Sequence, residues 1–478
     1  MSDSSSSGQQ TQTLDRSLGL VGTIMTILGC YAPATILFIY LPFYFFLFGG
    51  FTWPAIAIGF LLQIPLALCY AELGSAYPFA GGEYSMVGRS VSRGVGFVVF
   101  AAMFLGFCTI VPIAALGAGQ QLQVLWSSVD PRMVAVVIVV AGMILGIFNI
   151  KEAQWFAALF LVFQLVAIAI VVVLGVMHWH DPVSRLLTTE AFAPDGSAIP
   201  WTASAVIFAI SFGWLTMFGY GTTAVILSEE TKDPRRKMPR LVLISLGVIG
   251  VTLLVTTAAI QIGAPSLKEL SLAPNAVAWF VETLGNGTLG KIVSSLVFLA
   301  LAEASMMLVL MIGRMLWSSA RDNTWPTPVS KVLASLQPRF KSPWVATTLF
   351  GLICIGVVFI DLGRLIEMQV VITLLTCGLM ALGALLIRSR KSVPAGSWRM
   401  PLWPLAPIIV LVYVVAFMTK QTRYSLIITG VVVVVAIVYY VGFLMTRPKT
   451  HFVLDAPEAA GSSEPGPMAE TGPAPAAE

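Results

Sequence analysis

Glycine interrupts one long apolar stretch at three positions, Gly213, Gly219 and Gly221, and a second stretch at residues 29–35 combines a glycine with Pro33. In a membrane, irregular backbone persists only where it is buried in protein or lines a cavity. A broken helix there would present free N–H groups for an anion and free C=O groups for a cation. These residues therefore predict binding of a small polar solute.

The two interruptions lie five apolar segments apart, as expected for matching helices in the two halves of an inverted-repeat transporter. Aromatic side chains flank both interruptions, and such rings can close over a ligand or hold an amine by cation–π contact. Packing is the alternative, because glycine and proline are common in membrane helices for packing or kinks. The candidate substrate-binding residues are Gly29, Cys30, Tyr31, Ala32, Thr35, Phe212, Gly213, Trp214, Phe218, Gly219, Tyr220 and Gly221.

Glu303 lies in another apolar segment, eleven residues before Arg314. That separation is about 16 Å along a helix, roughly half the thickness of a bilayer core. An ionisable group at this depth suggests a function, so Glu303 is predicted to bind a coupling proton or to pair with a substrate ammonium. The alternative is a protonated carboxyl that hydrogen-bonds to a neighbouring helix. Gln164, within a further apolar segment, would line a site or link two helices.

The composition excludes a soluble protein. Of 478 residues, 57% are hydrophobic and 10% are charged, whereas soluble domains have about 25% charged residues. The five cysteines lie in apolar runs without a CxxC pair, and the three histidines lie outside the deep apolar runs, so no disulfide framework, metal site or cofactor is predicted. An enzyme would need a nucleophile or metal constellation, and nucleic acid would need a larger basic surface than these short clusters. The lipid bilayer is the predicted partner.

Twelve apolar segments approach or exceed the 20 or so residues that a membrane crossing takes. They predict an all-α integral membrane protein with twelve transmembrane helices, near residues 20–47, 53–72, 94–119, 133–148, 153–177, 201–228, 240–263, 288–317, 343–360, 365–387, 403–419 and 425–445. The distribution of basic residues tests this count. With both termini cytoplasmic, 20 of the 27 Lys and Arg residues fall in cytoplasmic segments. We therefore expect a multi-pass protein of the plasma (inner) membrane with both termini inside.

The two ends of the chain differ in composition from these spans. Residues 1–16 are rich in Ser, Gln and Thr and predict a disordered cytoplasmic segment that is not a cleaved signal peptide. Residues 448–478 predict a disordered cytoplasmic tail. The two longest outer loops cover residues 178–200 and 264–287, and the second has helix-like apolar spacing. It predicts a surface helix over an outer vestibule or an ordinary folded loop.

Several of these segments also carry motifs of a known family. Residues 70–91 resemble the segment between the second and third helices of amino acid–polyamine–organocation (APC) permeases. Residues 218–240 resemble the sixth helix and the signature that follows it, residues 313–326 the loop after the eighth helix, and residues 149–152 the entry to the fifth. The matching residues are Glu72, Leu73, Ser75, Tyr77, Pro78, Ala80, Gly81, Gly82, Tyr84, Asn149–Glu152, Glu229, Glu230, Pro234, Pro239, Arg314, Ala320, Arg321, Asp322 and Pro326.

This resemblance implies a leucine-transporter-like fold with a five-plus-five inverted repeat and two C-terminal helices. The transporter core would cover residues 17–390, with one repeat at about 17–178 and the other at about 200–390, and helices 11 and 12 would lie in residues 391–447. It implies a secondary active transporter that moves an amino acid or related amine by alternating access. The substrate would lie between helices one and six, with Gly219 at the break. Proton-coupled symport or exchange is expected, and a sodium site involving Thr35 and Ser305 is the alternative.

The first helix departs from the family pattern G-S-x-x-G-x-G-I-F, whose glycine-rich amides take an amino acid carboxylate. Residues 26–38 keep Gly29 alone, and Pro33 removes a backbone donor. Gly221 replaces an acidic residue that is frequent after the glycine of helix six. These departures predict a divergent branch carrying an amine, an amide or an unusual amino acid, so a polyamine or other organic-cation permease is one alternative. A channel or sensor built on the same fold is another.

The turn at residues 75–82 is punctuated by Pro and Gly, which predicts a tight, structured cytoplasmic turn. Glu72 and Glu83 lie close in sequence to Arg89 and Arg93. They would form ion pairs that make and break as the helices rock, or static pairs in contact with solvent.

Overall fold

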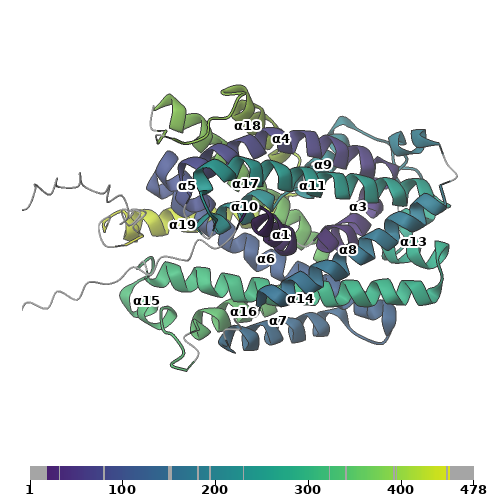
Figure 1. The fold of residues 1–478 in the computed structure, drawn as a ribbon, viewed down its shortest axis with the longest axis horizontal. Coiled ribbons are helices and arrows are strands. Elements are labelled where there is room, and N and C mark those ends of the chain that lie inside the picture. The colour runs from purple at the N-terminus through teal and green to yellow at the C-terminus, as the bar shows by residue number, and fades with distance from the viewer. Residues whose placement is uncertain are drawn as a thin grey trace, which may run out of the picture.

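The computed structural model describes residues 19–31, 33–78, 81–148, 153–179, 182–192, 195–229, 231–321, 323–339, 342–390, 393–394, 396–447 and 451–452. Within these ranges the chain is helical, and its one β interaction is an isolated antiparallel bridge between Phe192 and Ala198. The long helices run side by side along the longest axis of the molecule (Figure 1). The predictions for residues 1–16, for residues 149–152 and for all of the tail except 451–452 lie outside the described residues.

Each predicted span coincides with a helix or with a run of consecutive helices. The longer helices are α1 (Leu20–Tyr31), α3 (Leu41–Phe48), α4 (Thr52–Ala76), α6 (Arg93–Leu125), α7 (Pro131–Phe148), α8 (Ala153–Met177), α9 (Ala203–Leu215), α11 (Pro234–Gly263), α14 (Gly287–Arg321), α16 (Trp344–Val358), α17 (Leu362–Ser389), α18 (Leu405–Met418) and α19 (Arg423–Tyr439). Shorter elements are α2 (Pro33–Thr35), η1 (Ile36–Tyr40), η2 (Gly49–Phe51), α5 (Glu83–Ser90), η3 (Val183–Leu187), α10 (Tyr220–Ile226), η4 (Leu227–Glu229), α12 (Leu267–Leu272), α13 (Ala276–Leu284), α15 (Thr327–Leu333) and η5 (Tyr440–Leu444).

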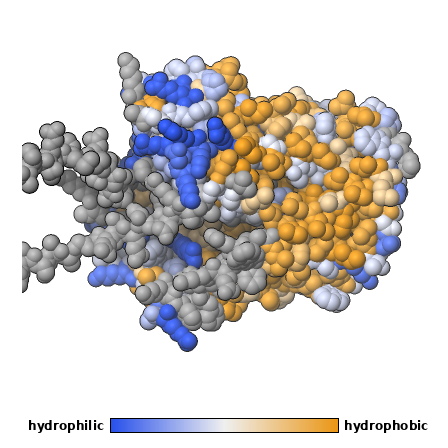
Figure 2. Space-filling view, in the orientation of Figure 1, coloured by the Kyte–Doolittle hydropathy of each residue, from blue (hydrophilic) through white to orange (hydrophobic). Residues whose placement is uncertain are grey.

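Eight helical segments of the described chain are long and apolar enough to cross a membrane, and three shorter apolar helices accompany them. The first of the eight, Gly22–Ala76, contains two of the predicted spans. Figure 2 shows an apolar belt over the middle of the visible face, with hydrophilic residues gathered at one end. Large apolar side chains such as Val412 and Leu61 are more than 60% exposed, which suits contact with lipid rather than water. The predicted class of integral membrane protein is confirmed, whereas the count of twelve crossings and the inverted repeat stay predictions.

The hydrophilic end of the molecule includes the start of α11, with its exposed residues Arg235 and Arg236, together with α15 and the end of α17. We call it the basic end. At this end the Arg388 Nε atom on α17 lies 2.5 Å from the Glu72 Oε1 atom on α4. The backbone N–H of Met400 donates to the other oxygen of Glu72 at 3.3 Å. A fully buried carboxylate therefore links two helices that are far apart in sequence.

The loop between α11 and α14 forms the two helices α12 and α13, as one of the two interpretations of its sequence predicts. Side chains at their N-termini accept hydrogen bonds from the first turn, Ser266 from the Glu269 N–H and Asn275 from the Ala278 N–H. Such caps satisfy backbone groups that lack a partner within the helix. Both helices pack on α3 and lie at the end of the molecule opposite the basic end (Figure 1).

Glycine allows α4 and α9 to pack backbone against backbone. A Cβ atom placed on Gly213 of α9 would lie 2.2 Å from the Ala55 carbonyl oxygen of α4. One placed on Gly59 of α4 would lie 2.4 Å from the Gly213 carbonyl carbon. Small residues at membrane helix interfaces permit this approach. The position of α9 against α4 is therefore set by two glycines.

Candidate functional site

Two of the predicted spans depart from continuous α-helix, and a cavity lies between them. The first consists of α1, α2, the π-helix η1 and α3, and Ala32 between α1 and α2 lies outside the described residues. The second consists of α9 and α10, which are separated by residues 216–219. Gly219 has φ +117°, a conformation that L-residues with a side chain rarely adopt. The break in the second span follows from the local sequence, because Gly219 precedes the first residue of α10.

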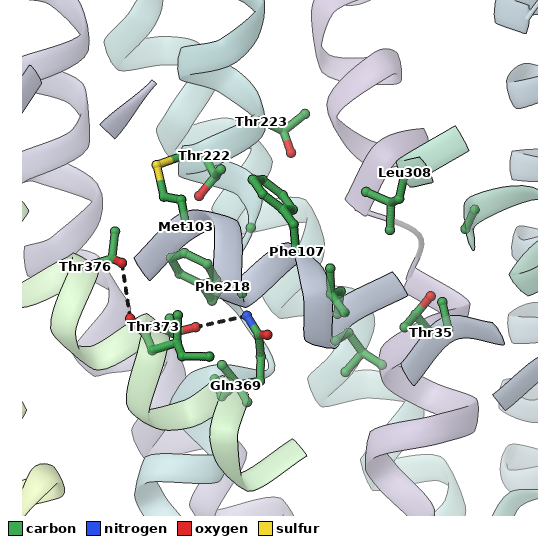
Figure 3. Close-up of a pocket in the computed structure, with 18 of the residues that line it drawn as sticks. Thr35, Met103, Phe107, Phe218, Thr222, Thr223, Leu308, Gln369, Thr373 and Thr376 are labelled. Carbon is green, nitrogen blue, oxygen red and sulfur yellow. Dashed lines mark hydrogen bonds between the residues drawn. The ribbon is translucent and has the colours of Figure 1, made fainter. Parts of the chain in front are cut away.

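The cavity has a volume of about 160 Å³. A dry engineered cavity of about 150 Å³ holds benzene, so the space suits a solute of a few heavy atoms. Most of the wall is apolar, and α6, α10, α14 and α17 complete it (Figure 3). The lining residues are Thr35, Ile36, Tyr40, Glu83, Met103, Gly106, Phe107, Ile110, Ala114, Leu215, Phe218, Gly219, Thr222, Thr223, Ile226, Ala304, Leu308, Met311, Gln369, Ile372, Thr373 and Thr376.

Glu83, at the first position of α5, is the acidic residue among the described residues of this wall, and these include no Lys, Arg or His. Its side chain is 1% exposed. Its Oε1 atom accepts a hydrogen bond from the Tyr70 hydroxyl on α4 at 3.1 Å and a second from the Thr222 hydroxyl on α10. Burial raises the pKa of the Glu83 carboxyl above its ordinary value, and these hydrogen bonds act in the opposite direction. The cavity therefore contains one titratable acid in contact with the second half of the broken helix.

The α17 side of the cavity is built from amide and hydroxyl groups. Gln369 accepts a hydrogen bond from the Thr109 hydroxyl at 2.5 Å, and its amide nitrogen donates to Thr373 at 3.3 Å. Figure 3 shows Gln369 and Thr373 on one side of the cavity and Thr35 on the other. Thr376 lies one turn beyond Thr373 and donates to the Ile372 carbonyl. These neutral groups can bind a hydroxyl, an amide or an amine without requiring a charge.

Aromatic side chains fill the space on the α9 side of the break. The rings of Tyr44, Phe48, Phe208 and Phe212 form edge-to-face and tilted pairs with centroids 4.8 to 6.0 Å apart. The Tyr44 hydroxyl also donates to the Phe212 carbonyl at 3.0 Å. This packing links α3 to α9 beside the break.

Three of the predicted binding residues line the cavity, namely Thr35, Phe218 and Gly219. The prediction that Gly213, Gly219 and Gly221 all interrupt a helix is wrong, because α9 continues through Gly213 and α10 contains Gly221. Gly213 allows the contact with α4, and a Cβ atom on Gly221 would lie 2.8 Å from the Tyr70 ring. Only the middle glycine lies at the break.

Three aromatic candidates are buried outside the cavity wall. Phe212 belongs to the aromatic packing on α9. The Trp214 indole N–H donates to the Tyr413 hydroxyl on α18 at 3.2 Å. Gln63 of α4 connects the two sides of the break, because its amide donates to the Trp214 carbonyl at 2.9 Å and its oxygen accepts from the Tyr220 hydroxyl at 3.1 Å. These side chains support the broken helix rather than facing the cavity.

The remaining candidates lie in the predicted first break, at residues 29–35. Gly29 lies inside α1, and Cys30 and Tyr31 are the last residues of that helix. Ala32 lies outside the described residues, as do the side chains of Cys30 and Tyr31. The backbone N–H of Ala34 donates to the Gln164 side-chain oxygen of α8 at 3.2 Å. Gln164 thus links two helices, as one of its two interpretations predicts, and occupies a backbone donor at the break.

Glu303 lies in the middle of α14 and is 7% exposed. It is not in the cavity wall, although its neighbour Ala304 is. Ser305 donates to the Val111 carbonyl of α6 at 3.3 Å, so this hydroxyl connects two helices. The coupling role of Glu303 stays a prediction.

The sequence reasoning overlooked Glu83, Thr222 and the polar residues of α17 as site residues. It also expected Glu72 and Glu83 beside Arg89 and Arg93, either as rocking pairs or in solvent, whereas both carboxylates are buried and Glu72 pairs with Arg388. Glu83 directly follows Gly81 and Gly82, a pattern that indicates a tight turn. A carboxylate at the end of such a turn is the sequence feature that could have indicated a site residue.

Comparison with known proteins gives a consistent assignment. Residues 18–443 match the family model for amino acid permeases. The chain is 26% identical over 355 residues to the low-affinity putrescine importer PlaP of Escherichia coli K12, covering 73% of this chain and 76% of that protein. It is 22% identical over 385 residues to the branched-chain amino acid permease BcaP of Lactococcus lactis, covering 75% and 80%. It is also 22% identical over 379 residues to the methylthioribose transporter of Bacillus subtilis, covering 74% and 78%.

These relatives are named as transporters and not as enzymes. The family model covers most of the chain, including both of these spans and the cavity between them. The chain belongs to the amino acid permease family of the APC superfamily.

Proposed function

We propose that this permease is a secondary active transporter that moves a small amine or amino acid across the plasma membrane by alternating access. The observation that carries the proposal is the cavity between the first span and the broken helix α9–α10, with Thr35 on the first and Phe218 and Gly219 on the second. The cavity suits a solute of a few heavy atoms, and free backbone groups at breaks are suited to binding polar solutes. The twelve crossings, the inverted repeat and the cytoplasmic location of both termini are parts of the same proposal.

Uptake by proteoliposomes tests this function. Radiolabelled leucine, putrescine and methylthioribose would be supplied separately, after a thermal-shift screen of amino acids and amines on the purified protein. We expect at least one solute to accumulate above its external concentration when an ion gradient is imposed. Equilibration without accumulation would indicate a channel, and binding without flux would indicate a sensor.

A matched pair of variants tests whether the substrate binds in the cavity. Phe218→Ala removes a ring from the cavity wall, whereas Val412→Ala shortens an exposed side chain on α18. We expect the first to raise the KM for uptake and the second to leave it unchanged. Equal uptake kinetics in the two variants would contradict the proposed location.

A permease for polyamines or other organic cations is the second candidate. It is favoured by Glu83, the single acid in a cavity wall without a basic side chain. Competition of putrescine with leucine for uptake separates the two candidates. Coupling to protons rather than sodium is proposed as well, and uptake after a pH jump, with and without sodium, tests it.

A further inference from the structure

One of the two oxygen atoms of the Glu83 carboxyl has no hydrogen-bond partner among the described residues. The Oε1 atom accepts hydrogen bonds from Tyr70 and Thr222. The Oε2 atom is buried and has no hydrogen-bond partner within the described part of the chain. A buried carboxyl oxygen without a donor is unfavourable unless it carries a proton or meets a cation. The cavity wall is where such a cation can arrive.

The basic residues on the helices around Glu83 are directed elsewhere. On α17, Arg388 pairs with Glu72. On α6, Arg93 donates to the backbone carbonyls of His451 and Phe452. These guanidinium groups are therefore engaged away from the cavity.

Apart from Arg89, the other titratable groups near Glu83 carry no positive charge. On its own helix α5, Arg89 lies near the Tyr77 hydroxyl, at the far end from Glu83. Tyr70 of α4 and Cys377 of α17 lie close enough to interact electrostatically with Glu83. Both are neutral at physiological pH in their ordinary state. An ionised Glu83 thus has two hydroxyl donors and lies in a cavity wall whose described residues include no basic side chain.

We propose that Glu83 binds the ammonium group of a small primary amine and releases a proton when it does so. The inference rests on the proposed transport function and names its substrate class. The carboxyl O–H bond breaks, the proton leaves to solvent, and the ammonium takes its place on Oε2. One positive charge enters and one leaves, so the cavity binds the amine without a change in net charge.

The rest of the cavity suits an amine without a carboxylate. Phe107 and Phe218 offer rings to an apolar chain. At the first break, Pro33 has no N–H and the Ala34 N–H is bonded to Gln164, so two donors that a carboxylate would use are lost. A short alkyl amine fits these features better than an amino acid does.

Isothermal titration calorimetry of the purified protein tests the inference. Isobutylamine, putrescine and leucine are titrated in two buffers with different heats of ionisation at one slightly acidic pH. We expect isobutylamine to bind with release of close to one proton per molecule. Glu83→Gln should weaken that binding about ten- to a hundredfold, as for loss of a charged hydrogen bond, and abolish the proton release. Glu282→Gln, on the exposed face of α13, is the matched control and should behave as the native protein.

Unchanged amine affinity and proton release in Glu83→Gln would overturn the inference. If that variant does not fold, Tyr70→Phe and Thr222→Val replace it. Each removes a donor to the ionised carboxylate, so half-maximal amine binding should move to higher pH, and an unmoved profile would also overturn the inference. Proteoliposome uptake distinguishes a failure of the proposed transport function from a failure of this inference. If the native protein accumulates no solute, the transport function fails; if it accumulates leucine with Glu83→Gln unaffected, only this inference fails.

Discussion

Replacing Gly213 by alanine tests whether the contact between α4 and α9 positions the broken helix. The added Cβ atom would lie 2.2 Å from the Ala55 carbonyl oxygen, whereas ordinary contact begins at 3.4 Å. The two helices must therefore separate by about 1 Å. Overpacking of this kind costs roughly 1–3 kcal/mol, against a gain of up to about 1 kcal/mol from replacing glycine in a helix.

Gly247→Ala in α11 isolates the second of these effects, because a Cβ atom there would meet no heavy atom within 4 Å. The two variants should therefore differ in free energy of unfolding by about 1–3 kcal/mol, with Gly213→Ala the less stable. Denaturant unfolding in detergent measures this difference. Uptake by proteoliposomes should fall in Gly213→Ala alone, since α9 leads directly to Phe218 and Gly219. Equal stability and equal uptake in the two variants would refute the reasoning.

Four further changes give distinct expectations. Glu303→Gln should abolish uptake while expression and amine binding persist, and unchanged uptake would remove this residue from the coupling mechanism. Gln63→Leu removes the side-chain hydrogen bonds of Gln63 with the Trp214 carbonyl and the Tyr220 hydroxyl, so it should destabilise by about 1–3 kcal/mol in unfolding assays and lower uptake. The pKa of Glu83 is raised in the folded protein, so its contribution to stability is present below the ordinary pKa of glutamate and is lost as pH rises through the folded pKa. The melting temperatures of the native protein and Glu83→Gln should therefore converge or cross over that pH window. A constant difference between the two melting temperatures would contradict this expectation. Arg388→Met should cost about 3–5 kcal/mol because it strands the buried Glu72 carboxylate, and adding Glu72→Gln should recover part of the loss; no recovery in the double variant would argue against the pair.

The positions of the helices follow closely from the sequence. Continuous apolar runs determine where a chain can satisfy its backbone in lipid, and each run corresponds to helix in the structure. The break at Gly219 could be predicted equally well, because a glycine next to a predicted family signature indicates irregular backbone. The family assignment rested on loop motifs and is confirmed by the match over residues 18–443.

The direction of each side chain could not be predicted in this way. Gly213 and Gly219 look alike in sequence, yet one meets the backbone of a neighbouring helix and the other lies at the break. Trp214 and Tyr220 flank the break but face α18 and α4. Glu83 reaches the cavity because α5 packs beside α6 and α17. These differences depend on contacts between distant segments, which hydropathy and local patterns do not encode.

The ion pair between Glu72 and Arg388 limits how the molecule can move. Separating α4 from α17 would leave a charge in a nonpolar interior, at a cost of several kcal/mol, and would also break the Met400 contact. We therefore expect these two helices to move together as one rigid unit across the proposed repeats. In the proposed transport cycle, motion that opens one side of the cavity and closes the other would pivot around these two helices, which leaves the short helix α10, beyond the break at Gly219, as the hinged part. Spin labels on α4 and α17 should keep a constant separation throughout a transport cycle.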